Sequence, residues 1–322
     1  MLKKTSIRKI LVSLSALFAL FLIYLIPNGS YENKLNIDYE LNYIEEDVDK
    51  EVIYLLDSYN MLGRGEIVFN EKTSDIELKA RNLIQVLIKG GEGEDHIPNG
   101  FRSILSSETK ILSLKYNEGI IKIDFSKDLL DIDKENEEKA VEAIVYTLTS
   151  IDGVDKVIIY VEGDILNKLP QTKKNLPAIL DKSFGINKEY DITSINNITM
   201  TTTYYINKYN DEYYYVPVSK FSNDDRNKIT IIVDNLSSSP SYKANLMSFL
   251  NYNTKLLSAT QDVDSLSLNF NSYIFNDSSE KKILEEVIHT ISLSVADNYD
   301  VKELVFKVDD EEIYKTTFKT IE

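Results

Sequence analysis

The stretch Thr109-Lys110-Ile111-Leu112-Ser113 returns 145 residues later as Thr254-Lys255-Leu256-Leu257-Ser258. Downstream of each copy lies an alternating segment, residues 121–125 (IKIDF) in the first and residues 266–270 (LSLNF) in the second. Alternation of apolar and polar residues is typical of an antiparallel strand with one buried face. The same pair of strands at the same spacing predicts that the chain contains one structural unit twice.

The predicted helices repeat in the same way. In each helix, apolar residues recur at positions i, i+3, i+4 and i+7, which places them on one face. The first pair of stripes is Ala80, Leu83, Ile84 and Leu87 against Ile229, Ile232, Val233 and Leu236. The second pair is Val141, Ile144, Val145 and Leu148 against Leu284, Val287, Ile288 and Ile291.

Each unit opens with two strand-like runs and closes on one more. The opening runs are residues 51–55 with 65–69 and residues 204–206 with 213–216, and the closing strands are residues 157–161 and 304–308. Two helices on one face of a mostly antiparallel sheet would bury both helical stripes and the inward strand residues. The predicted fold class is therefore α+β, with two tandem copies of a small module.

These repeats set the expected domain boundaries. The first module spans residues 51–170, the second residues 201–320, and residues 171–200 form a connector. A chain of 322 residues suits two domains. We expect the two modules to superpose with their core positions buried, which pairs Ile84, Ile121 and Val145 with Val233, Leu266 and Ile288. Lys122 and Asp124 should point the other way.

Residues 10–26 (ILVSLSALFALFLIYLI) predict a single transmembrane anchor at the cell membrane. Their length lies at the low edge of the roughly 17–25 residues that span a bilayer. Four basic residues precede them and an acidic stretch follows, so the positive-inside rule leaves residues 1–9 as a cytoplasmic basic tail. Residues 27–50 would be a linker, and the bulk of the chain would lie outside the cytoplasm. A cleaved signal peptide and a buried core helix are the alternatives.

Composition excludes several classes of function. The net charge of −16 repels phosphates, so we expect no nucleic-acid partner, and contact with a membrane should come only from the N-terminal helix. The chain contains no cysteine, which excludes a lipidated cysteine, a thiolate metal site and a cysteine nucleophile.

No motif predicts catalysis, a cofactor or a metal, so we expect a protein that is not an enzyme and has no such site residues. His96 follows the glycine-rich and acidic run 90–95, which matches no calcium-loop spacing and is typical of a solvated loop. His289 lies beside an apolar stripe, where a partly buried structural histidine is expected. Exposed charged faces explain carboxylate pairs such as residues 137–138 and 309–310.

A tyrosine cluster in residues 204–215 is the candidate interaction site. Two adjacent strand-like runs would carry aromatic rings on both faces; one face must be core, and the other would expose phenol rings suited to a protein interface. The candidate interface residues are Tyr205, Tyr209, Tyr213, Tyr214 and Tyr215. The alternative is a strand pair that the preceding domain covers.

The ordered set of elements resembles the GerM family of sporulation and spore germination proteins, in tandem. The resemblance is carried by residues 100–105 (GFRSIL), both Thr-Lys strands, the Gly119 turn, residues 157–163 and, in the second copy, residues 215–218 (YVPV). The chain departs from the family pattern where Ser106-Ser107 and Asn251 replace a proline and where the second copy lacks a glycine matching Gly163. The family's lipid anchor requires a cysteine, and this chain contains none.

The resemblance implies a module similar to the ring-building modules of secretion systems and a role in assembling an envelope complex without catalysis. We therefore expect a membrane-anchored scaffold or assembly factor of sporulation or germination. Its partners would be other envelope proteins, with an oligomer of the chain itself also considered. The alternatives are a module that binds cell-wall polymer or another ligand of the envelope, and an enzyme that uses a carboxylate pair.

Overall fold

The computed structural model describes residues 50–69, 73–238, 245–277 and 279–318. The expected tail and anchor, and nearly all of the expected linker, lie outside the described residues. Within the described part of the chain, no helix is long and apolar enough to span a bilayer.

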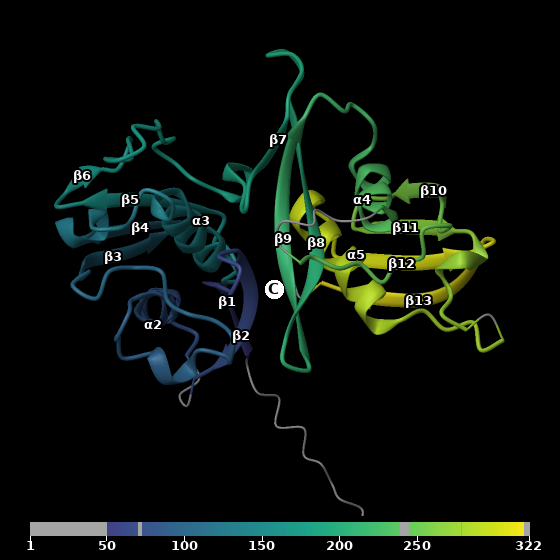
Figure 1. The fold of residues 1–322 in the computed structure, drawn as a ribbon, viewed down its shortest axis with the longest axis horizontal. Helices are drawn as coiled ribbons and strands as arrows, with labels where there is room; N and C mark the ends of the chain where they lie inside the picture. Colours follow the sequence, from purple (N-terminus) through teal and green to yellow (C-terminus); the bar gives the residue numbers. More distant parts are fainter. Residues whose placement is uncertain (1–49, 70–72, 239–244, 278, 319–322) are drawn as a thin grey trace, which may run out of the picture. The chain divides into compact units, whose positions relative to one another are not determined.

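The first repeat contains three strand pairs and two helices (Figure 1). In chain order, these are β1 (Lys50–Leu56), β2 (Leu62–Val68), α2 (Ile76–Leu87), β3 (Ile111–Asn117), β4 (Ile120–Phe125), α3 (Glu137–Leu148), β5 (Lys156–Val161) and β6 (Asp164–Ile165). Short 3-10 helices are η1 (Glu94–His96), η2 (Lys127–Leu130) and η3 (Lys182–Phe184).

The second repeat has the same order of strands and α-helices, preceded by the short strand β7 (Glu189–Asp191). Its elements are β8 (Thr199–Tyr209), β9 (Glu212–Ser222), α4 (Lys228–Ser237), β10 (Leu256–Gln261), β11 (Ser265–Phe270), η5 (Ser272–Ile274), α5 (Glu285–Asn298), β12 (Glu303–Val308) and β13 (Glu311–Thr317). The predicted α+β content and the repetition are confirmed.

Each repeat has its own four-stranded sheet, β3-β4-β5-β6 or β10-β11-β12-β13. The two outer ladders are antiparallel, as expected, but the central pair is parallel, with Ile121 opposite Val157 and Leu266 opposite Leu304. A helix connects the two strands of each central pair, and such a crossover returns the chain in the same direction. The sheets are therefore mixed.

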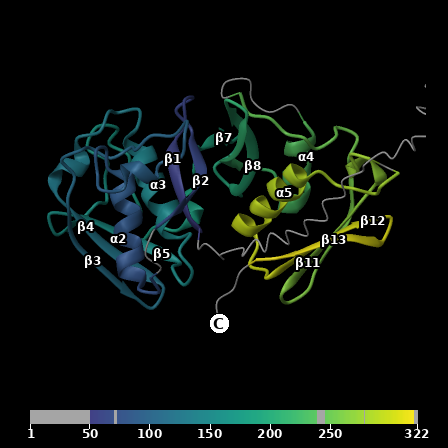
Figure 2. The ribbon, with the colours of Figure 1, turned by 90° about the horizontal axis from the view of Figure 1, so that it is seen from below.

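The opening strands do not join these sheets, which corrects the expectation of one sheet per module. Strand β1 pairs with β2, and β2 pairs with β9 of the β8-β9 hairpin, which gives a shared five-stranded sheet of order β1-β2-β9-β7 in which β8 also pairs with β9. Figure 2 shows α3 and α5 lying between this shared sheet and the outer sheets. Helix α3 buries residues on all sides, including Ala143, Tyr146 and Thr147. A helix buried all round needs cover on more than one side.

The predicted core positions are buried in both repeats. Ile84, Ile121, Val145, Val233, Leu266 and Ile288 all lie in the two hydrophobic cores. Lys122 is exposed and Asp124 is half-buried, so the alternation of this strand is as predicted.

Part of the expected connector, residues 171–200, belongs to the first core rather than forming a simple link. Leu176, Leu180 and Ile186 are buried in it, and Leu180 exchanges two backbone hydrogen bonds of 2.8 Å with Val157. These apolar residues are isolated among polar ones in the sequence, so no periodic pattern marked them.

Candidate functional site

Equivalent residues of the two opening hairpins meet at the junction between the repeats. Tyr54 and Tyr204 lie 150 positions apart, and their hydroxyls share a hydrogen bond of 2.7 Å. Asn207 donates to Asp57 at 3.4 Å across the same interval of 150. Contact between matching positions of two copies is the property of a two-fold axis. The repeats therefore meet with pseudo-two-fold symmetry.

The helices attach to the hairpins in the same way in both repeats. The backbone N–H of Tyr54 donates to Thr147 Oγ1 at 3.1 Å, and that of Tyr204 donates to Ser294 Oγ at 2.9 Å. Position 147 therefore corresponds to position 294, an offset of 147. This corrects the sequence alignment of the second helices, which paired Val145 with Ile288 and was wrong by one helical turn. Val145 corresponds to Ser292.

Asn187 completes the shared sheet where a proline interrupts it. Its side chain accepts from Leu62 N at 2.9 Å and donates to the carbonyls of Leu62 and Pro217 at 2.8 Å each. Pro217 has no N–H to donate, so the amide takes the place of direct pairing between the strands. Strands β2 and β9 pair directly only between Arg64 and Tyr215 among the described residues.

A buried polar chain crosses the junction. Tyr204 donates to Asp297 Oδ2 at 2.7 Å, and Lys182 lies 2.7 Å from Asp297 Oδ1. Burial raises the pKa of Tyr204 well above its usual value, and the Asp297 carboxylate adds to this effect. The phenol therefore stays a hydrogen-bond donor. Because Asp297 is almost fully buried, these partners are what make its charge tolerable there.

Helix α3 of the first repeat also holds two buried glutamates, Glu137 and Glu142. Burial raises the pKa of Glu142 to about 7, against the opposing effect of Lys188. Burial acts on Glu137 as well, but hydrogen bonds from Gln171 and Thr172 lower its pKa overall. The expectation that residues 137–138 form an exposed charged face is therefore wrong for Glu137, whose partners lie in the segment expected as a connector.

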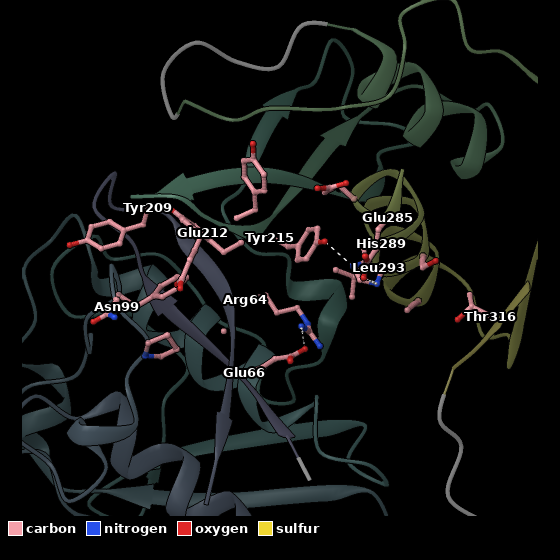
Figure 3. Close-up of a pocket in the computed structure, with 18 of the residues that line it drawn as sticks. Arg64, Glu66, Asn99, Tyr209, Glu212, Tyr215, Glu285, His289, Leu293 and Thr316 are labelled. Carbon is pink, nitrogen blue, oxygen red and sulfur yellow. Dashed lines mark hydrogen bonds and ion pairs between the residues drawn. The ribbon is translucent and has the colours of Figure 1, made fainter. Parts of the chain in front are cut away.

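A cavity of about 630 Å³ opens between the repeats (Figure 3). Strand β2 and the loop before Phe101 supply one wall, and the β8-β9 hairpin and α5 supply the others. Its polar and charged lining includes Arg64, Glu66, Glu212, Glu285, Glu286 and His289. Figure 3 shows Arg64 directed at Glu66 and Tyr215 directed at His289. The Arg64 guanidinium lies 2.7 Å from Glu66 Oε1, and the Tyr215 hydroxyl lies 2.9 Å from His289 Nδ1.

Four of the five candidate tyrosines line this cavity. Tyr209 and Tyr213 are exposed, and Tyr209 lies so close to Gly100 that an added Cβ there would be 2.4 Å from its ring. Tyr215 binds His289, and burial raises its pKa to about 12, helped by Glu286 and Glu285. Tyr205 instead packs against the second core.

Tyr214 is the tyrosine that the preceding repeat covers. It donates to Asp57 at 2.9 Å and packs edge-on against Phe101 with ring centroids 4.8 Å apart. The alternative prediction, a strand pair that the preceding domain covers, therefore holds for Tyr214. Tyr209 and Tyr213 remain partly exposed to solvent.

One of the two histidines differs from expectation. His289 is exposed, with 47% of its side chain accessible, so the expectation of a partly buried residue is wrong. His96 lies in η1 and packs against Phe69 with ring centroids 5.2 Å apart, while Glu92, Glu94 and Asp95 of the same run are exposed, in keeping with a solvated segment. Across the described ranges, no group of three or more His, Asp or Glu side chains is placed to hold a metal ion.

Sequence reasoning missed the residues that fix the junction. Asn187, Asp297 and Lys182 belong to no periodic pattern. The one available signal was the interval of 150 between Tyr54 and Tyr204, which marks the same strand position in both repeats.

Comparisons with known proteins agree with this architecture. The Germane family, described as "Sporulation and spore germination", matches residues 52–167 and 202–314. Spore germination protein GerM of Bacillus subtilis is 32% identical over 239 residues, which cover 72% of this chain and 65% of that protein. The match thus spans less than two thirds of the relative's length. The solved tandem GerMN domains of the sporulation protein GerM from Bacillus subtilis give a TM-score of 0.73 at 27% identity, covering 82% of this chain and 92% of that one.

Proposed function

The chain belongs to the Germane family of sporulation and spore germination proteins, and from that premise we propose that it is a non-enzymatic scaffold that assembles an envelope complex during sporulation or germination. Its partners are other proteins of the envelope. The observation that carries this proposal is the shared five-stranded sheet, which joins the two modules directly.

A joined pair of modules suits assembly because it presents two similar surfaces in one fixed arrangement. The junction is closed by Asn187, by the Tyr54–Tyr204 hydrogen bond and by the Asp297–Lys182 ion pair. Residues 48–322 accordingly form one compact unit. Partners bound on the two outer sheets would be held at a fixed spacing, which a flexible linker would not provide.

The polar groups of the junction support a structural rather than a catalytic role. Tyr204 and Lys182 both bind Asp297. Glu137 binds backbone and side-chain groups of residues 171–172. Side chains paired in this way hold segments together. The names of the relatives likewise refer to processes, sporulation and germination, and to no reaction.

Membrane attachment through residues 10–26 is part of the proposal. The apolar run and its basic flank support an anchor whose N-terminus is cytoplasmic. Protease added to cells without a wall should digest residues 28–322. Protection of these residues would contradict the orientation, and a mature chain that begins near residues 28–30 would show a cleaved signal instead.

A deletion strain and affinity purification test the scaffold role. Loss of the gene should reduce the yield of spores or their germination, and the full-length chain purified from membranes should carry other envelope proteins with it. Normal spores from the deletion strain, together with a chain that purifies alone, would contradict the proposal.

A ligand-binding module for cell-wall polymer is the second candidate, and the cavity between the repeats favours it. Exposed aromatic rings beside carboxylates, as at Tyr209, Tyr213 and Glu212, are a common lining of ligand sites. Sedimentation with purified cell walls separates the candidates, since a wall-binding module pellets with the walls and a protein scaffold does not.

A further inference from the structure

The same face of the second helix has different surroundings in the two repeats. The offset of 147 between α3 and α5 pairs Glu138 with Glu285, Glu142 with His289 and Val145 with Ser292. These three positions are spaced i, i+4 and i+7, so they share one face of the helix in each repeat. What covers them therefore shows what each repeat binds there.

In the first repeat, a lysine-bearing segment of the chain itself covers this face. Lys188 Nζ lies 2.9 Å from Glu138 and 3.5 Å from Glu142, and 3.2 Å from the centroid of the Phe184 ring. The backbone N–H of Asn187 donates to Glu142 at 2.9 Å. Residues 182–190 thus occupy the site with a cation, an aromatic ring and backbone hydrogen bonds.

In the second repeat, the matching positions line the cavity, and two of them, Glu285 and His289, are exposed. Glu285 has 81% of its side chain exposed. Four glutamates line the cavity against one arginine, Arg64, which already pairs with Glu66, so the charged lining is net negative. A concave surface of one sign attracts opposite charge. Lys208 Nζ already lies 5.7 Å from the centroid of the exposed Tyr213 ring, so a cation is accommodated at that end of the hairpin.

Ser292 is a second difference between the two repeats on this helix face. It lines the cavity and is 9% exposed, yet its Oγ has no hydrogen-bond partner among the described residues. Two positions along the same helix, Ser294 accepts from Tyr204 N and donates to the carbonyl of Thr290. Buried hydroxyls are normally paired, and this Oγ is itself shielded from solvent, so it marks an unsatisfied position beside the cavity rather than a contact point within it.

We propose that the cavity between the repeats binds an extended, lysine-bearing segment of a partner protein, in the way that residues 182–190 fill the equivalent site of the first repeat. This inference deepens the assembly role and rests on it. The ammonium group would lie beside Glu285, as Lys188 lies beside Glu138 in the first repeat. The volume of about 630 Å³ exceeds that of one side chain, so flanking backbone can enter as well.

The test uses the chain's own occupant as a probe. A fluorescent peptide with the sequence of residues 182–190 (KSFGINKEY) is titrated with the full-length protein in detergent, and its anisotropy is measured. We expect saturable binding that weakens about tenfold when the lysine at position 188 of the peptide is acetylated. The protein variant Glu285→Gln with Tyr213→Leu should weaken binding by a similar factor.

A matched variant separates the cavity from the general acidity of the chain. Glu108→Gln with Tyr252→Leu removes one exposed acid and one exposed tyrosine that do not line the cavity, and it should leave binding unchanged. Equal weakening by both variants, or no binding by the wild type, would overturn the inference. So would binding of soluble cell-wall peptides in place of the probe.

Purification from membranes keeps this inference distinct from the scaffold role. If the cavity variant loses the probe but retains every partner of the wild type, the cavity is not the docking site, and the scaffold role stands. If the wild type retains no partner at all, the scaffold role fails, whatever the probe does. Loss of one partner together with loss of the probe supports both.

Discussion

In the first repeat, the face of α3 that carries Glu142 and Val145 is closed by the chain itself, whereas in the second repeat the matching positions of α5 line the cavity. The residues differ accordingly. Glu142 is buried beside Lys188, and its counterpart His289 is exposed; Val145 is core, and its counterpart Ser292 has an unpartnered hydroxyl. One helix face can thus serve as core or as binding surface, depending on what covers it.

The parts that the repeats share should respond equally to truncation. Ile144 and Ile291 correspond and are both fully buried. Replacing either by Ala leaves a cavity and should cost about 2–5 kcal/mol of unfolding free energy, measured by urea denaturation. A difference of more than about 2 kcal/mol between the two variants would show that the cores are not equivalent.

The matched pair Tyr54 and Tyr204 should respond asymmetrically because, of these two, only Tyr204 contacts an acid. Tyr204→Phe removes the donor to buried Asp297 and should cost about 1–3 kcal/mol. Tyr54→Phe removes only the bond between the two hydroxyls and should cost about 1 kcal/mol. Thermal unfolding of both variants checks the order, and a larger loss for Tyr54→Phe would contradict the role assigned to Asp297.

The buried carboxyl group of Glu142 should make the stability of the first repeat depend on pH. The pKa of Glu142 is raised to about 7 in the folded state, above its value in the unfolded chain, so the folded state binds its proton more tightly. Its contribution to stability is then present at low pH and is lost as the pH rises from about 4.5 to 7.

The variant Glu142→Gln isolates this effect. Relative to Glu142→Gln, the wild type should lose roughly 1–3 kcal/mol across that range, measured by urea denaturation at several pH values. Ile144→Ala changes no titratable group and should keep a constant difference. A wild type that gains stability over Glu142→Gln as the pH rises would contradict the assignment.

The smallest predicted change in stability concerns Ser292, beside the cavity of the second repeat. Ser292→Val introduces the residue that the first repeat has at this position and removes an unpartnered hydroxyl, so it should stabilise the protein by about 1 kcal/mol. Ser294→Ala, which removes two hydrogen bonds, is the matched control and should destabilise. Destabilisation by Ser292→Val would show that the hydroxyl is satisfied in the free protein.

Local pattern predicted the elements of each repeat but not how the repeats join. The alternation at residues 121–125 and the helical stripes located strands and helices because these depend on neighbours a few residues away. The pairing of β2 with β9 depends on residues 151 positions apart, Arg64 and Tyr215, and no local pattern reports it. The helix alignment slipped by one turn because an apolar stripe repeats nearly every four residues.

The candidate site was predicted in part for the same reason. The tyrosines of residues 209–215 were visible as a dense aromatic run, and four of the candidates line the cavity. Ser292 and Glu285 gained meaning only from their counterparts in α3, which required the correct offset of 147. Residues 182–190 had no periodic pattern, so their role as the occupant of the first site was not visible.

The distance between the two outer sheets tests most directly whether the repeats form one fixed pair. Leu112 and Leu257 are equivalent and exposed on β3 and β10, and the chain has no cysteine, so Leu112→Cys with Leu257→Cys allows specific spin labelling. Pulsed electron paramagnetic resonance should give one narrow distance distribution, and adding Tyr204→Phe should broaden it. A broad or multiple distribution in the otherwise unaltered protein would contradict the account.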